Sequence, residues 1–134
     1  RPSPRHGWTE GGHWDAALRG PQLAVRTLLL GADPGPLSPA DDPVPYVFST
    51  QLGHELGLLG VPGPQDVLVL RSGESGWTTL WFRPGTATLT AVLGVDMPRD
   101  VAAARHLFAG STLPQLDRTR AADASVPLRS AVIG

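Results

Sequence analysis

The side chains of this sequence that could support chemistry are four histidines, four tryptophans and two adjacent aspartates. The histidines are His6, His13, His54 and His106, and none forms the close pair typical of zinc-binding helices or loops. Because the chain has no cysteine, thiolate nucleophiles, cysteine-ligated zinc and cysteine-held iron–sulfur clusters are excluded for this segment. We therefore predict no metal site and no catalytic residue, and any redox chemistry would need a cofactor.

The remaining polar motifs give little support to a hydrolase or a nucleotide-binding loop. No serine lies in a G-x-S-x-G element, which would expose a nucleophile over an oxyanion hole. The glycines of residues 53–63 do not match G-x-G-x-x-G, and no helix of suitable pattern follows them. Asp41 and Asp42 lie in a proline-rich stretch, where we expect paired carboxylates to be solvated rather than catalytic.

The tryptophans are the strongest candidates for contact with a planar ligand, because large aromatic rings either fill cores or stack on groups such as flavins. Trp77 and Trp81 lie four residues apart on a predicted strand and share one face, which favours a core or a domain interface over ligand contact. Trp14 begins a predicted helix and is not explained in this way.

The elements that would position these residues begin with a helical arm. Residues 1–12 show no periodic pattern, so we expect little order in them. Residues 13–30 carry apolar side chains at helical spacing, Gly31 is placed to end the helix, and Pro21 marks a kink or a second start. Residues 32–45 contain five prolines and three aspartates without an apolar period, which predicts a stiff linker.

The chain after this linker is typical of an antiparallel sheet covered by helices. Runs rich in Val, Thr, Leu and aromatic residues predict strands within 46–59, 66–72, 76–84 and 86–96. Residues 98–110 predict a helix with Pro98 in its first turn and Gly110 as its stop, and residues 126–133 are expected to pack back on the sheet. The predicted fold class is α+β: an antiparallel meander of three to five strands with helices packed on it, preceded by a single N-terminal helical arm.

Composition limits the possible partners. A chain of 134 residues with 41% hydrophobic and 17% charged residues should fold as one small domain, with or without an extra arm. A net charge of -1 argues against nucleic acid or an anionic membrane as partner, and the longest apolar stretch is too short to cross a bilayer. The amino end has neither an initiator methionine nor signal-peptide features. We interpret it as a cut end and expect a cytoplasmic protein from a GC-rich bacterium.

Several segments of the chain together resemble one family. Residues 13–31, HWDAALRGPQLAVRTLLLG, and 43–51, PVPYVFSTQ, are similar to segments of the bacterial FAD-dependent NAD(P)H:ferredoxin reductases. This family belongs to the pyridine nucleotide–disulfide oxidoreductase superfamily and includes putidaredoxin reductase and the reductases of aromatic-ring dioxygenases. The resemblance continues in order through DVLVLR, the strand Trp77–Phe82, VDMPRDVAAARHLFAG and ASVPLRSAV. It implies that residues 1–31 are a remnant of the FAD-binding domain, 32–45 a linker and 46–134 the reductase's C-terminal domain.

The resemblance also implies which residues contact the cofactor. In the family, the segment containing His-Trp forms the last helix of the FAD-binding domain, with its Trp against the flavin, and His13 and Trp14 occupy these positions here. The family motif P-x-F-W-S-D-Q begins the C-terminal domain near the flavin edge, and Phe48 stands where the motif has Trp. Further departures from the family pattern indicate an altered flavin environment or a different electron acceptor. They are Gly12, Ala16, Thr50, Asp96 and Met97.

The function implied for the parent protein is electron transfer from NAD(P)H through FAD to a ferredoxin-type iron–sulfur protein. Its partners would be that protein and the upstream FAD- and NAD-binding domains, with a homodimer also possible, whereas the isolated fragment is expected neither to bind FAD tightly nor to turn over. One alternative is a free-standing, non-catalytic interaction or dimerisation module. Another is a flavoprotein related to nitrite or disulfide reductases; it ranks lower because disulfide reductases usually carry a catalytic His near the end, and the last histidine here is His106.

Overall fold

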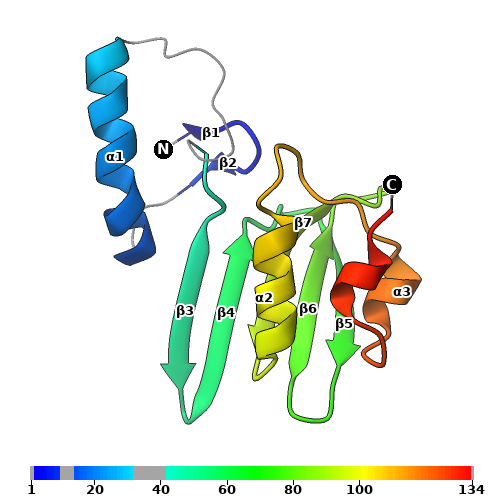
Figure 1. The fold of residues 1–134 in the computed structure, drawn as a ribbon. Coiled ribbons are helices and arrows are strands. Elements are labelled where there is room, and N and C mark those ends of the chain that lie inside the picture. The colour runs from blue at the N-terminus through cyan, green and yellow to red at the C-terminus, as the bar shows by residue number, and fades with distance from the viewer. Residues whose placement is uncertain (1, 10–13, 32–41, 134) are drawn as a thin grey trace.

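The computed structural model describes residues 2–9, 14–31 and 42–133. Its centre is a five-stranded antiparallel sheet with the strand order β3-β4-β7-β6-β5 (Figure 1). The strands are β3 (Tyr46–Gln51), β4 (His54–Gly60), β5 (Val67–Ser72), β6 (Trp77–Phe82) and β7 (Leu89–Val95). The predicted α+β class and antiparallel sheet are confirmed. Strands β5, β6 and β7 form a meander, and the hairpin β3–β4 joins it through β7 rather than through β5.

Two positions with left-handed backbone set the geometry of the hairpin β3–β4. Its two-residue turn is Leu52-Gly53, with φ of 51° and 80°. Both central residues of the turn type that suits the twist of antiparallel strands need positive φ. At the other end of β4, Gly60 has φ of 83°, and a Cβ atom there would overlap the carbonyl oxygen of Thr90. Glycine is therefore required where β4 ends beside β7.

The helices of the domain cover one face of this sheet. The helix α2 (Pro98–Leu107), with Pro98 at its start as predicted, lies over β4 and β7, and α3 (Arg118–Ala122) packs on β5 (Figure 1). Close approach of α2 depends on glycines, because a Cβ atom at Gly94 would lie 2.6 Å from the side chain of Val101. The final apolar segment forms a 3-10 helix, Leu128–Ala131, whose two end residues enter the core against α2 and α3.

The helical arm is α1 (Trp14–Leu30), a continuous helix with Pro21 inside it rather than at its start. It extends away from the sheet beyond the start of β3, and its N-terminal end is near the beginning of that strand (Figure 1). Within the described residues, no helix is both long and apolar enough to cross a lipid bilayer.

The expectation of little order before the helical arm is wrong for residues 2–9. They form a hairpin of β1 (Pro2–Ser3) and β2 (Gly7–Trp8), and Arg5 attaches this hairpin to the domain. The Arg5 guanidinium donates to the carbonyl oxygen of Phe108 at 3.1 Å and to those of Gly110 and Asp42. Its Nε also lies 3.4 Å from Oδ2 of Asp42. Hydrogen bonds to distant residues thus supply order that no local pattern predicts.

The same contact corrects the interpretation of Asp42 as a solvated carboxylate. Asp42 is 2% exposed and pairs with Arg5, because the hairpin folds over this part of the predicted linker. Asp41 lies outside the described residues.

Candidate functional site

The candidate site lies on the edge strand β3. Two aromatic side chains, two positions apart on this strand, lie on the face of the sheet that the helices cover. Tyr46 and Phe48 pair with Leu59 and Gly57 of β4, and their ring centroids are 5.6 Å apart with planes tilted by 40°. Phe48 is 39% exposed, because β3 has no further strand beside it. The edge therefore presents an accessible aromatic surface.

A positive charge lies over this surface. Arg105 of α2 places its guanidinium carbon 5.0 Å from the centre of the Tyr46 ring, within the range of a cation–π interaction. We call Tyr46, Phe48 and Arg105 the aromatic edge. Its rings can stack on a planar ligand, and its guanidinium can attract electron-rich atoms of that ligand.

The helical arm brings one more predicted residue toward the aromatic edge. Helix α1 begins at Trp14 and contacts β3, so the backbone of Trp14 and the strand of Phe48 lie on the same side of the molecule. His13 and the side chain of Trp14 are outside the described part of the structure. Contact of His13, Trp14 and Phe48 with a flavin stays a prediction.

Sequence reasoning did not single out Tyr46 or Arg105. Tyr46 could have been found, since side chains two residues apart on a strand share a face and Phe48 was already a candidate. Arg105 gave no such signal, because its place over Tyr46 results from the packing of α2 against the sheet. The tryptophans Trp77 and Trp81 do share one face of β6, as predicted, and it is the face opposite the helices.

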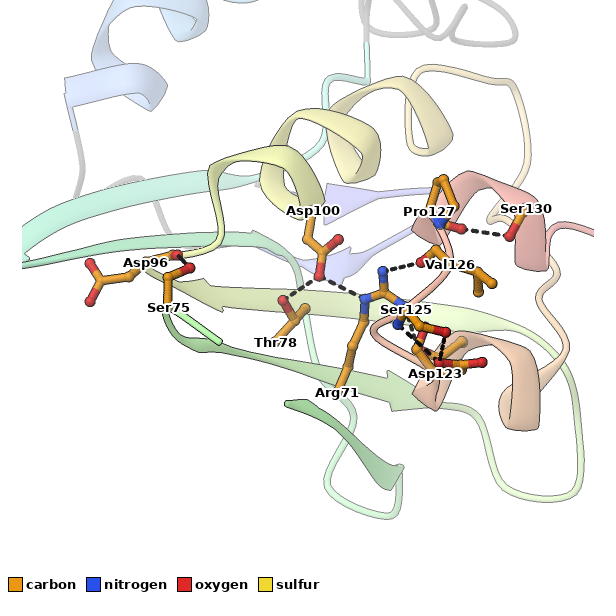
Figure 2. A network of polar contacts seen from close by, with 11 residues as sticks. Arg71, Ser75, Thr78, Asp96, Asp100, Asp123, Ser125, Val126, Pro127 and Ser130 are labelled. Atoms are coloured by element: carbon orange, nitrogen blue, oxygen red, sulfur yellow. Dashed lines mark hydrogen bonds and ion pairs between the residues drawn. The ribbon is translucent and has the colours of Figure 1, made fainter. Parts of the chain in front are cut away.

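A buried ion pair on the helix-covered side of the sheet holds the C-terminal segment in place (Figure 2). Arg71 of β5 is 2% exposed, and its Nε donates to Oδ2 of Asp100 at 2.8 Å. The same carboxylate oxygen accepts a hydrogen bond from the hydroxyl of Thr78 at 2.7 Å. The remaining guanidinium nitrogens of Arg71 donate to backbone carbonyls that follow α2 in the sequence. They are the carbonyls of Ala121, Asp123 and Val126. Figure 2 shows Asp100, Asp123 and Val126 around the guanidinium, so Arg71 is a structural cation rather than a ligand-binding group.

A second polar group lies at the turn end of the hairpin β3–β4. Nδ1 of His54 is 2.6 Å from Oδ2 of Asp96, and the backbone N–H of Glu55 donates to the other carboxylate oxygen at 2.9 Å. These two hydrogen bonds lower the pKa of Asp96 below its ordinary value, and the hydrogen bond from His54 has the larger effect. Asp96 has φ of 53°, a conformation that Asp and Asn tolerate better than most residues.

The lowered pKa predicts a specific loss of stability in acid. A carboxylate whose pKa is lower in the folded than in the unfolded state stabilises the fold above its unfolded pKa, and this contribution is lost as pH falls through the folded pKa. We expect Asp96→Asn to flatten the decline of the melting temperature below about pH 4, the ordinary value for aspartate. Thermal unfolding of the chain and of Asp96→Asn across the acid range measures this difference. The exposed change Glu74→Gln is the control, and the same acid profile for Asp96→Asn and the unmodified chain would contradict the prediction.

Comparison with known proteins assigns this architecture to a family. The model of the family described as Reductase C-terminal matches residues 46–132. The chain is 31% identical over 118 residues to the ferredoxin–NAD(+) reductase component of the anthranilate 1,2-dioxygenase system of Burkholderia cepacia. That alignment covers 87% of this chain and 27% of the relative, so the chain spans about a quarter of the relative's length.

Solved structures show the same fold. The structure described as Fdr9 is 33% identical with a TM-score of 0.73, covering 96% of this chain and 32% of that one. The reductase in a covalent putidaredoxin reductase–putidaredoxin complex is 17% identical with a TM-score of 0.70, covering 92% and 28%, which supports the fold alone. Since the family model matches well over half of its residues, the chain belongs to the Reductase C-terminal family.

Proposed function

We propose that this chain is the C-terminal domain of an FAD-dependent oxidoreductase that passes electrons from NAD(P)H to a ferredoxin-type iron–sulfur protein. The family match over residues 46–132 carries the proposal. It is supported by the similarity to a ferredoxin–NAD(+) reductase component. The use of NAD(P)H implies a cytoplasmic location for the parent protein. The predicted division into residues 1–31, 32–45 and 46–134 belongs to this proposal.

The aromatic edge would form one wall of a flavin site. In the parent protein, bound FAD would accept a hydride from NAD(P)H and release electrons one at a time. This chain would contribute the ring of Phe48 for contact with the flavin, together with Trp14 at the start of α1 and His13, the residue before it in the sequence. The guanidinium of Arg105 would add positive charge beside that wall. The sequence has no G-x-G-x-x-G loop to hold the cofactor's phosphates, so the upstream domains would bind FAD tightly and this chain would not.

The absorption spectrum of the protein made from the complete reading frame tests this function. We expect flavin bands that bleach when NADH is added without oxygen and that return when an oxidised ferredoxin-type protein is supplied. The 134-residue chain alone should be colourless. A full-length protein that is colourless and takes up no added FAD would refute the reductase proposal and favour the non-catalytic interaction module.

Phe48 provides a test of the site itself. If its ring contacts the flavin, Phe48→Ala in the full-length protein should weaken flavin binding about 2- to 10-fold, given ~0.5–1.5 kcal/mol for an aromatic contact. Flavin release measured by fluorescence gives the affinity, and the visible bands should shift as the ring environment changes. Phe48→Trp restores the residue of the family motif and should bind flavin at least as well. The control is Gln51→Ala at the exposed end of β3, and equal flavin affinity in Phe48→Ala and Gln51→Ala would remove Phe48 from the site.

A further inference from the structure

The sheet has a second face that the described helices leave uncovered. Side chains alternate along each strand, and the residues of β6 that point toward the helices are Thr78, Leu80 and Phe82, all fully or almost fully buried. The strand register places the alternate residues of all five strands on the other side. We call this side the open sheet face; its large apolar members are Val47, Leu56, Leu58, Leu68, Leu70, Trp77, Trp81, Leu93 and Val95.

The large side chains on β5 and at the start of β6 leave much of the open sheet face exposed although it is apolar, whereas Val95 in the central strand β7 is buried. Leu68 is 56% exposed, Leu70 53% and Trp77 46%. The alternate strand positions on this side contain no Asp, Glu, Lys or Arg; their polar members carry hydroxyl or amide groups, with His54 at one end. An antiparallel sheet with one face in water normally carries polar residues on that face. The open sheet face has instead the composition of an interface core, rich in aromatic and aliphatic residues and depleted of charge.

The chemistry of this face indicates a permanent contact. Redox encounters between proteins are small and transient, whereas permanent interfaces are more hydrophobic. A ferredoxin that must bind and leave is therefore a poor match for a charge-free patch containing Trp77 and the leucines of β5. An apolar surface that remains in place matches this composition better.

We infer that the open sheet face packs against the body of the same polypeptide that lies outside this chain, so that it is an internal domain interface of the longer protein. The inference rests on the proposed function. The chain spans 27% of the matched Burkholderia relative and 32% of the matched Fdr9 chain, so each of these relatives has a large body beyond the matched domain. A covalently attached body is present at an effective concentration in the millimolar range for short linkers, which exceeds that of a second copy at ordinary protein concentrations.

Side-chain footprinting tests this packing without any mutation. Hydroxyl-radical labelling of the 134-residue chain and of the protein from the complete reading frame should give several-fold slower modification of Trp77, Leu68 and Leu70 in the longer protein. Leu52, which is 99% exposed at the β3–β4 turn, is the internal control and should be modified equally in both. Equal labelling of Trp77 and Leu70 in the two proteins would overturn the inference. Protection that appears in the 134-residue chain as its concentration rises, without further protection in the longer protein, would identify a second copy and would also overturn it.

A matched pair of substitutions gives an independent measurement. In the longer protein, Leu70→Glu places a charge in the inferred interface and should raise the labelling of Trp77 toward its value in the short chain. Leu52→Glu makes the same chemical change away from this face and should leave it unaltered. The flavin spectrum of the unmodified longer protein separates the two proposals. Protected Trp77 in a protein without flavin supports the interface and refutes the reductase, whereas unprotected Trp77 in a working reductase refutes the interface alone.

Discussion

Replacing Arg71 by methionine should lower the free energy of unfolding by about 3–5 kcal/mol, the cost of leaving one member of a buried ion pair without its partner. Asp100 is only 4% exposed and would keep the hydroxyl of Thr78 as its side-chain partner in the network of Figure 2. The backbone carbonyls of the C-terminal segment would also lose their donor. Equilibrium denaturation monitored by tryptophan fluorescence measures the change.

Two further variants identify the cause of that loss. Arg129→Met removes an exposed arginine and should change stability by less than about 0.5 kcal/mol. The double variant Arg71→Met/Asp100→Leu removes both charges, so it should recover part of the stability. The recovery should be incomplete, because the carbonyls of Ala121, Asp123 and Val126 still lack the guanidinium. A loss for Arg71→Met no larger than that for Arg129→Met would show that the buried network does not stabilise the domain.

Among substitutions of alanine for a glycine within a strand of the sheet, Gly60→Ala should lower the free energy of unfolding most. Its positive φ costs an L-residue about 1–2 kcal/mol, and the new Cβ would overlap the Thr90 carbonyl, adding a further ~1–3 kcal/mol. The obstacle is backbone of the neighbouring strand β7, which cannot move aside as a flexible side chain can. Denaturant titration should show a lower midpoint for this variant.

Gly85 provides a matched control for the steric part of this effect. It has φ of 67°, and a Cβ atom there would have no neighbour within 4 Å. Gly85→Ala should therefore show the conformational cost alone, and the difference between the two variants isolates the overlap with Thr90. Equal losses of stability for the two variants would mean that β7 accommodates the added methyl group.

The parts of the fold that could be predicted are those encoded by local pattern. The helix α2 follows from its apolar spacing and from Pro98, whose missing N–H and fixed φ suit a helix start. Strands β5, β6 and β7 follow from runs of β-branched and aromatic residues bounded by turns, whereas the single run predicted at 46–59 divides into β3 and β4 at Leu52-Gly53. The pairing of β4 with β7 does not follow, because the sequence pattern specifies which face of a strand is apolar but not which strand lies beside it.

The candidate site divides in the same way. Phe48 was identifiable from a motif, and its alternation with Tyr46 predicts that the two rings share a face. The position of Arg105 over Tyr46 and the pairing of Arg5 with Asp42 depend on tertiary packing. Arg5 and Phe108 are 103 positions apart, a separation at which local periodicity carries no information. The prediction that Asp42 is a solvated carboxylate was wrong for this reason.

The docking of residues 2–9 has a consequence for the freedom of α1. Arg5 and Asp42 are in contact, and α1 lies between them in the sequence. Their contact therefore closes the segment that contains α1 into a loop. A segment held at both ends explores a much smaller volume than a pendant arm of the same length. The Arg5–Asp42 contact thus limits how far α1 can move from β3. Loss of this contact would leave the start of α1 held to the domain from one side only.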